Sequence, residues 1–217
     1  HPLSRRQRQM CIRDRTYSNS SLNNFEKNKF KNLLGERYPK FDEMFEEASI
    51  ETNIEKNLLA AISFQESQWD PKAKSNMGVR GMMMVTLETA ALVGVEKRLN
   101  PEQNIKGGAK YFAMLQEKNK IGPTDPDKLS ITLASYNLGP TNIFNIANSI
   151  DKEIENVSWV EISEQLKTIK GSELNLTDKD NYTRGQQAID YVDRVKNYYQ
   201  LLSAHSCIAP RDQLIFF

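Results

Sequence analysis

The sequence is punctuated by helix start and stop signals, and this pattern constrains its fold more than any other feature. Apolar residues recur at three- and four-residue spacing in one segment after another, while the alternation typical of half-buried strands is almost absent. Pro101 and Pro126 each follow a good N-cap residue, and Gly94 and Gly139 are suited to end helices. The pattern therefore predicts a mainly α protein.

Individual helices can be assigned from these signals. Thr52 and Glu55 have the spacing of a capping box, which predicts a helix from about Ile54 that ends near Trp69, before Pro71. The other expected helices are Phe25–Leu34, Phe41–Ala48, Thr86–Gly94, Asn100–Leu115, Asp125–Gly139, one opened by Ser158 with Glu161, and Arg184–Leu202, which carries Ala188, Tyr191, Val192, Val195 and Tyr199. We expect the polar stretch 170–181 to be a loop.

The composition is that of an ordinary folded protein, with 217 residues, 39% hydrophobic and 26% charged. This length supports one sizeable core or one core with a small appendage. We divide the chain into a non-native or disordered tail (1–15), a helical lead-in (16–50), a main helical domain (51–203) and a C-terminal tail outside the helical pattern (204–217). No segment approaches the roughly 18 consecutive apolar residues of a transmembrane helix, and no signal peptide is visible.

Charge and residue counts exclude several function classes. Five Arg and one Asp in residues 1–15 give a surplus of +4, so the remainder is slightly acidic and lacks the basic, aromatic stripe of a nucleic-acid-binding surface. The only cysteines are Cys11 and Cys207, and the only histidines are His1 and His205. This argues against His- or Cys-dependent nucleophilic catalysis and zinc binding, so we expect no metal or cofactor.

Glu66 is the strongest candidate for a catalytic residue. With Leu59 and Ile62 it falls at i, i+3 and i+7 on one helix face, so its carboxylate projects from the face assigned to the core. Desolvation would raise its pKa, as a general acid active near neutral pH requires. The alternative is a structural ion pair between Glu66 and a basic group such as Arg80.

Two further segments contain candidate binding residues. Gly78 and Gly81 in "AKSNMGVRGMMM" permit tight turns or close approach of a polymer to the backbone, although they would equally suit a hairpin, and the methionines would suit a core. Tyr136 and Asn137 in "LASYNLGP" end a helix where a phenol and an amide can face a cleft, or where the tyrosine simply packs.

These segments together resemble one family. Glu66-Ser67, "GVRGMMM", "NPEQNIKGGAKY" and "SYNLGP" are similar in order and spacing to the catalytic domain of the soluble lytic transglycosylases, over roughly residues 58–201. The loop is most similar to that of the membrane-bound lytic murein transglycosylase F group. The resemblance implies a helical domain with a lysozyme-like fold, similar to that of goose-type lysozymes, at residues 51–203.

The resemblance also implies an activity. Such enzymes cleave the MurNAc–GlcNAc β-1,4 bond of peptidoglycan and leave 1,6-anhydro-MurNAc ends, with one Glu, here Glu66, acting as acid and then as base. The implied substrate-binding residues are Ser75, Gly81, Met83, Met84, Tyr136, Asn137 and Tyr191. Met84 departs from the Gln of many soluble members, which removes one amide contact to the glycan but leaves the acid in place.

Two alternatives remain. A goose-type lysozyme-like hydrolase that inverts would need a second carboxylate roughly 6.5–9.5 Å from the acid, and the acids between Ser67 and Gly94 are Asp70 and Glu88. A non-catalytic glycan-binding module would be expected to have lost the acid. The family further implies a monomer in the periplasm or cell envelope that binds peptidoglycan strands, with outer-membrane association through a segment missing from this chain.

Overall fold

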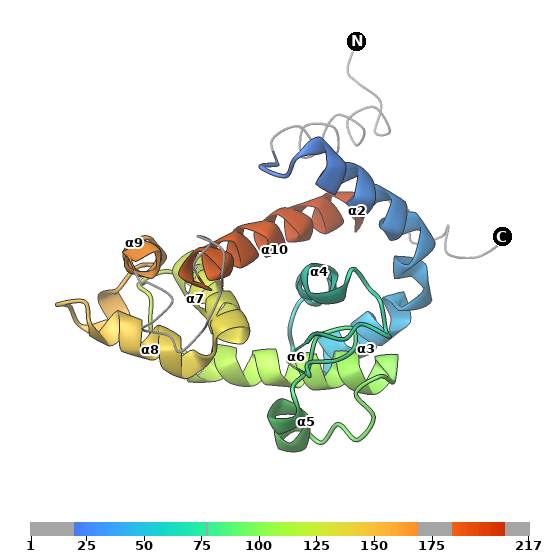
Figure 1. Ribbon diagram of the computed structural model, residues 1–217, viewed down its shortest axis with the longest axis horizontal. Coiled ribbons are helices and arrows are strands. Elements are labelled where there is room, and N and C mark those ends of the chain that lie inside the picture. The colour runs from blue at the N-terminus through green and yellow to red at the C-terminus, as the bar shows by residue number, and fades with distance from the viewer. Residues whose placement is uncertain (1–19, 77, 169–183, 207–217) are drawn as a thin grey trace, which may run out of the picture. The chain divides into compact units, whose positions relative to one another are not determined.

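The computed structural model describes residues 20–76, 78–168 and 184–206, and these fold into α-helices joined by turns (Figure 1). The helices are α2 (Asn24–Glu36), α3 (Asp42–Thr52), α4 (Lys56–Ser67), α5 (Leu87–Val93), α6 (Pro101–Lys118), α7 (Asp125–Leu138), α8 (Pro140–Asn148), α9 (Trp159–Thr168) and α10 (Arg184–Ser206), with the 3-10 helices η1 (Tyr38–Lys40) and η2 (Ile154–Asn156). Within these residues, β-type pairing is limited to two isolated bridges. The mainly α prediction is confirmed.

The chain divides into two compact units, which we describe separately. The first holds the described residues up to Gly107 and those from Arg194 onward, and the second holds those from Gly108 to Asp193. Helices α6 and α10 contribute residues to both. In the described part of the chain, no helix combines the length and the apolar character needed to cross a membrane.

The first unit is built around an aromatic cluster between α2, α4 and α10. Phe30 stacks on Tyr198 with ring centroids 5.2 Å apart and meets Phe64 edge-on at 4.9 Å. Trp69 is fully buried 4.7 Å from the Phe64 ring, and its Nε1 donates to the Ala60 carbonyl at 2.9 Å. Each such aromatic pair stabilises a core by about 0.5–1.5 kcal/mol beyond area burial, so this cluster fixes the position of α4.

The second unit packs α7, α8 and α9 against one another. The Asp127 carboxylate in the first turn of α7 accepts a hydrogen bond from the Trp159 backbone at 3.0 Å, which ties the start of α9 to α7. A Cβ on Gly185 would lie 2.0 Å from the Leu166 carbonyl oxygen. The absence of a side chain at Gly185 therefore lets the start of α10 approach the end of α9.

The boundaries of α4 differ from the sequence prediction. The capping box was wrong: Thr52 is the last residue of α3, where its hydroxyl donates to the Ala48 carbonyl at 2.7 Å, and α4 starts at Lys56. Asn53 adopts a left-handed conformation that ends α3, and the competing hydroxyl contact removes Thr52 as a cap. The helix ends at Ser67 because Gln68 and then Trp69 are left-handed.

Most other helix signals were read correctly. Thr86 caps α5 and Gly94 ends it, and Ser158 and Glu161 exchange the expected capping contacts at α9. Helix α8 was missed, because Pro140 not only ends the preceding helix but also occupies the first turn of a new one. Of the two adjacent tyrosines in α10, Tyr198 is buried, whereas Tyr199, which the sequence placed on the apolar face, is half-buried. The expected loop 170–181 lies outside the described residues.

Candidate active site

Glu66 lies in the last turn of α4 and is half-buried. At about 100° per residue it projects between Leu59 and Ile62, both fully buried, as the sequence pattern predicts. The helix ends one residue later, so the carboxylate is placed where the apolar face of α4 meets the following loop. Burial of its apolar residues fixes α4 in the core. Because α4 ends at Ser67, the Glu66 carboxylate is only partly buried.

The segment that follows α4 is a compact glycine loop, residues 71–85, which the structure describes apart from residue 77. Two serines of α4 contact this loop at the carbonyl of Met82. Ser63 donates to the Met82 carbonyl at 3.0 Å, and the hydroxyl of Ser67, next to Glu66, lies 2.8 Å from the same oxygen. One face of α4 therefore contacts the loop through Ser63 and Ser67, and the adjacent face carries Glu66.

A fully buried amide on α6 holds the same loop from the other side. The Asn104 Oδ1 accepts from the Met83 backbone at 2.7 Å, and its Nδ2 donates to the carbonyls of Arg80 at 3.0 Å and Arg98 at 2.8 Å. The sequence interpretation missed Asn104, although it lies inside a segment quoted for the family resemblance. The only sequence feature that could have indicated this role is that the polar Asn104 stands next to Ile105, a residue expected in the core.

Gly81 is required where the loop crosses α6. Its φ is +83°, and a Cβ there would lie 2.3 Å from the Arg98 carbonyl oxygen and 2.5 Å from Asn104 Nδ2. Its backbone donates to the Ala73 carbonyl at 2.9 Å, and the next turn closes with Met84 donating to Gly81 at 3.1 Å. The tight-turn interpretation of this glycine holds, and the close approach is to the chain's own Arg98 and Asn104; approach of a polymer stays a prediction.

The remaining loop candidates differ in exposure. Met83 is fully buried, so its side chain offers no surface for the glycan contact expected of it, whereas Met84 is half-buried with a positive φ of 48°. Ser75 is half-buried, and its hydroxyl accepts from the Val79 backbone at 3.2 Å. Arg80 is exposed.

The candidates of the second unit lie near the end of α7 and on α10. Tyr136 is half-buried, with its ring centroid 5.6 Å from that of Tyr111 and 6.1 Å from that of Phe112. Burial raises the pKa of Tyr111, which keeps its hydroxyl protonated as a hydrogen-bond donor. Asn137 is exposed beside this cluster, and Tyr191 is buried.

Two acids near Glu66 in the sequence were considered as partners for an inverting hydrolase. Asp70 is half-buried, and its carboxylate accepts the Lys72 backbone N–H at 2.9 Å, which closes a turn. Glu88 is exposed in the first turn of α5, where a carboxylate stabilises the helix N-terminus. Both acids therefore have local structural roles.

The fold is that of lysozyme-like lytic transglycosylases. The 70 kDa soluble lytic transglycosylase of Escherichia coli superposes with a TM-score of 0.54 at 22% identity, covering 93% of this chain and 31% of that one. The lytic transglycosylase Slt of Pseudomonas aeruginosa, solved as an inactive mutant, gives a TM-score of 0.54 at 16% identity over 77% of this chain and 24% of that one.

Sequence comparison then identifies the family. Residues 43–158 match the family described as Transglycosylase SLT domain. The membrane-bound lytic murein transglycosylase F 1 of Alkalilimnicola ehrlichii is 37% identical over 80% of this chain and 35% of its own length. The transglycosylase F of Aeromonas hydrophila is 40% identical over 76% of this chain and 33% of its own. The chain belongs to the transglycosylase SLT family and spans about a third of the length of these relatives.

Proposed function

We propose that this chain cleaves the MurNAc–GlcNAc β-1,4 bond of peptidoglycan and forms 1,6-anhydro-MurNAc ends, with Glu66 as acid and then base. The observation that carries the proposal is the family match over residues 43–158, which includes α4 with Glu66, the glycine loop and Tyr136.

In the proposed first step, protonated Glu66 donates its proton to the glycosidic oxygen as the bond from that oxygen to C1 of MurNAc breaks. The carboxylate then accepts the proton of the C6 hydroxyl while O6 bonds to C1. The proton lost in the first step is recovered in the second, so no water is consumed. A single carboxyl group that is neither fully exposed nor fully buried suits this cycle, because both its protonated and its ionised form must be accessible.

The other residues have supporting roles in this proposal. Tyr136 and Asn137 would contact the sugar or the acid, as the family resemblance implies, and Ser75, Gly81 and Met84 would form the loop surface against which the glycan lies. Tyr191 is buried, so any role in substrate binding would pass through its neighbours. Met83 would act as a core residue that holds the loop in shape.

Digestion of purified peptidoglycan in H₂¹⁸O tests the reaction class. We expect muropeptides with anhydro ends, one water lighter than hydrolysis products and free of ¹⁸O. Reducing ends that carry ¹⁸O would show that the enzyme is a hydrolase and would overturn the anhydro mechanism. Binding to peptidoglycan without any cleavage would identify a glycan-binding module instead.

The proposed location is the cell envelope, since the relatives are named membrane-bound murein enzymes. We propose that the protein acts as a monomer on the periplasmic side, with outer-membrane association supplied by sequence outside this chain. Fractionation of cells that express the full-length protein, followed by size-exclusion chromatography of this chain, measures both properties.

A further inference from the structure

A second candidate site lies on another side of α4 from Glu66, with its α4 wall formed by Phe64 and Gln65, roughly 160° and 100° around the helix from Glu66. A pocket of about 390 Å³ opens between α2, α4 and α10, a volume within the range of small-ligand sites. The pocket is therefore distinct from the proposed catalytic face.

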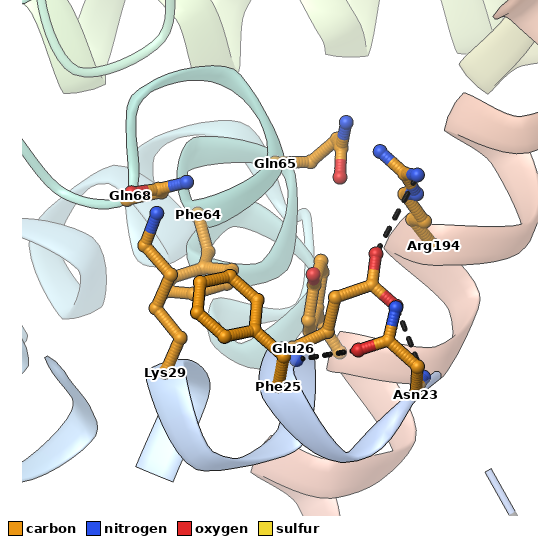
Figure 2. Close-up of a pocket in the computed structure, with 9 residues that line it drawn as sticks. Asn23, Phe25, Glu26, Lys29, Phe64, Gln65, Gln68 and Arg194 are labelled. Atoms are coloured by element: carbon orange, nitrogen blue, oxygen red, sulfur yellow. Dashed lines mark hydrogen bonds and ion pairs between the residues drawn. The ribbon is translucent and has the colours of Figure 1, made fainter. Parts of the chain in front are cut away.

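The pocket combines an exposed aromatic ring with polar side chains (Figure 2). The Phe25 side chain is 73% exposed, so its ring is accessible to a ligand. In Figure 2, Lys29 and Gln68 lie on one side of the Phe25 ring, and Gln65 and Arg194 lie on the other. A ligand seated on the ring would thus find amide groups and a cation on both sides.

Glu26 is the one acid among the described residues that line the pocket, and it is occupied by internal contacts. Its Oε2 accepts the Asn23 backbone N–H at 3.0 Å in the capping box of α2, and its Oε1 lies 3.5 Å from the Arg194 guanidinium. Lys29, by contrast, is exposed and forms no ion pair with any residue that the structure describes. The charge left for a ligand is therefore positive.

These features together define the class of ligand. An exposed ammonium and a partly engaged guanidinium suit carboxylates, the two amides suit peptide N–H and C=O groups, and the phenyl ring suits small aliphatic side chains. A neutral sugar would need the ring and the amides but not the cations. We propose that this pocket binds a short acidic peptide, such as the peptide that branches from peptidoglycan strands. The identification of peptidoglycan as the source of this peptide rests on the proposed function, whereas the binding of an acidic peptide does not.

Binding can be measured directly by titrating the ¹⁵N-labelled chain with the soluble peptide released from peptidoglycan by an amidase. We expect shifts at the amides of Phe25, Lys29, Gln65 and Gln68. The same peptide with its carboxylates converted to carboxamides should bind at least about fivefold more weakly, and salt should weaken only the acidic form. Equal binding of the two peptides, or stronger binding of an N-acetylglucosamine oligomer, would overturn the proposal.

Matched variants locate the contact on the protein. Lys29→Gln removes a cation that has no ion-pair partner among the described residues, and it should weaken binding of the acidic peptide by about threefold to tenfold. Lys31→Gln, exposed on the same helix outside the pocket, should have no effect. Phe25→Ala should weaken both peptides. Unchanged affinity in Lys29→Gln would refute the site.

The two proposals can fail independently. Glu66→Gln should bind the acidic peptide with unchanged affinity, because its side chain projects from another side of α4. If peptidoglycan is not cleaved but the peptide binds at these residues, the proposed function fails and the pocket assignment stands. If cleavage occurs and the acidic peptide causes no shifts at the pocket, the proposed function stands and the pocket assignment fails.

Discussion

Replacing Asn104 by Ala should lower the free energy of unfolding by about 3 kcal/mol. Its fully buried side chain makes three hydrogen bonds, to the backbones of Met83, Arg80 and Arg98. Each such bond contributes about 1 kcal/mol net, and Ala also leaves one N–H and two carbonyls without these partners. Water entering the vacated space would offset part of this cost, so about 2 kcal/mol is the lower limit.

The measurement is urea unfolding at neutral pH, compared with two further variants. Asn100→Ala removes one exposed capping bond from the Gln103 backbone, 2.9 Å long, and should cost only about 1 kcal/mol. Asn104→Asp keeps the acceptor for Met83 but directs a carboxylate at two carbonyl oxygens, so it should be less stable than the Ala variant. If Asn104→Ala costs no more than Asn100→Ala, or Asp proves the milder change, Asn104 does not hold the loop as described.

Four other predictions concern the site and the fold. Glu66→Gln should abolish nearly all cleavage of peptidoglycan, by at least about 10⁴-fold, with thermal unfolding unchanged; wild-type turnover would refute its role. Tyr136→Phe should reduce the cleavage rate while changing stability by only about 1 kcal/mol in urea, and unchanged kinetics would leave the ring as packing. Gly81→Ala should destabilise by at least about 2 kcal/mol because its Cβ meets backbone at a positive φ, whereas Gly35→Ala, in open space within α2, should stabilise by about 0.5–1 kcal/mol in the same assay. Glu161→Gln should destabilise near neutral pH, because hydrogen bonds from Lys152 and Ser158 lower the pKa of Glu161 from 4.5 to about 2. The stability difference is present above pH 4.5 and should vanish as pH falls through about 2, and a pH-independent difference in urea midpoints would contradict this.

Helix positions could be predicted because their signals are local. Thr86 and Gly94 bound α5 through contacts within the helix itself, so the chain nearby contains the whole explanation. The start of α4 was misread because Thr52 is engaged within α3 and Glu55 also has a distant partner. Glu55, expected inside that helix, is its N-cap and accepts the Tyr199 hydroxyl from α10, a pairing across 144 positions that no local spacing reveals.

The candidate site divides in the same way. The place of Glu66 on an apolar helix face could be predicted because it follows from periodicity, whereas its catalytic role stays a prediction. Asn104 could not, because what marks it is the set of three backbone groups it satisfies, in segments up to 24 positions away. The exposure of the methionines could not be predicted either: Met82 and Met83 are fully buried and Met84 is half-buried with a positive φ, which the sequence does not display.

The contacts of Ser67 link the stability of the glycine loop to the position of the acid. Much of the loop backbone is paired within the loop, and polar side chains from α4 and α6 provide partners for the Met82 carbonyl and the Met83 N–H. Because Ser67 directly follows Glu66, a shift of the loop tip must either break the contact to Met82 or move the last turn of α4. Substitutions that loosen the loop are therefore expected to lower activity before they unfold the protein.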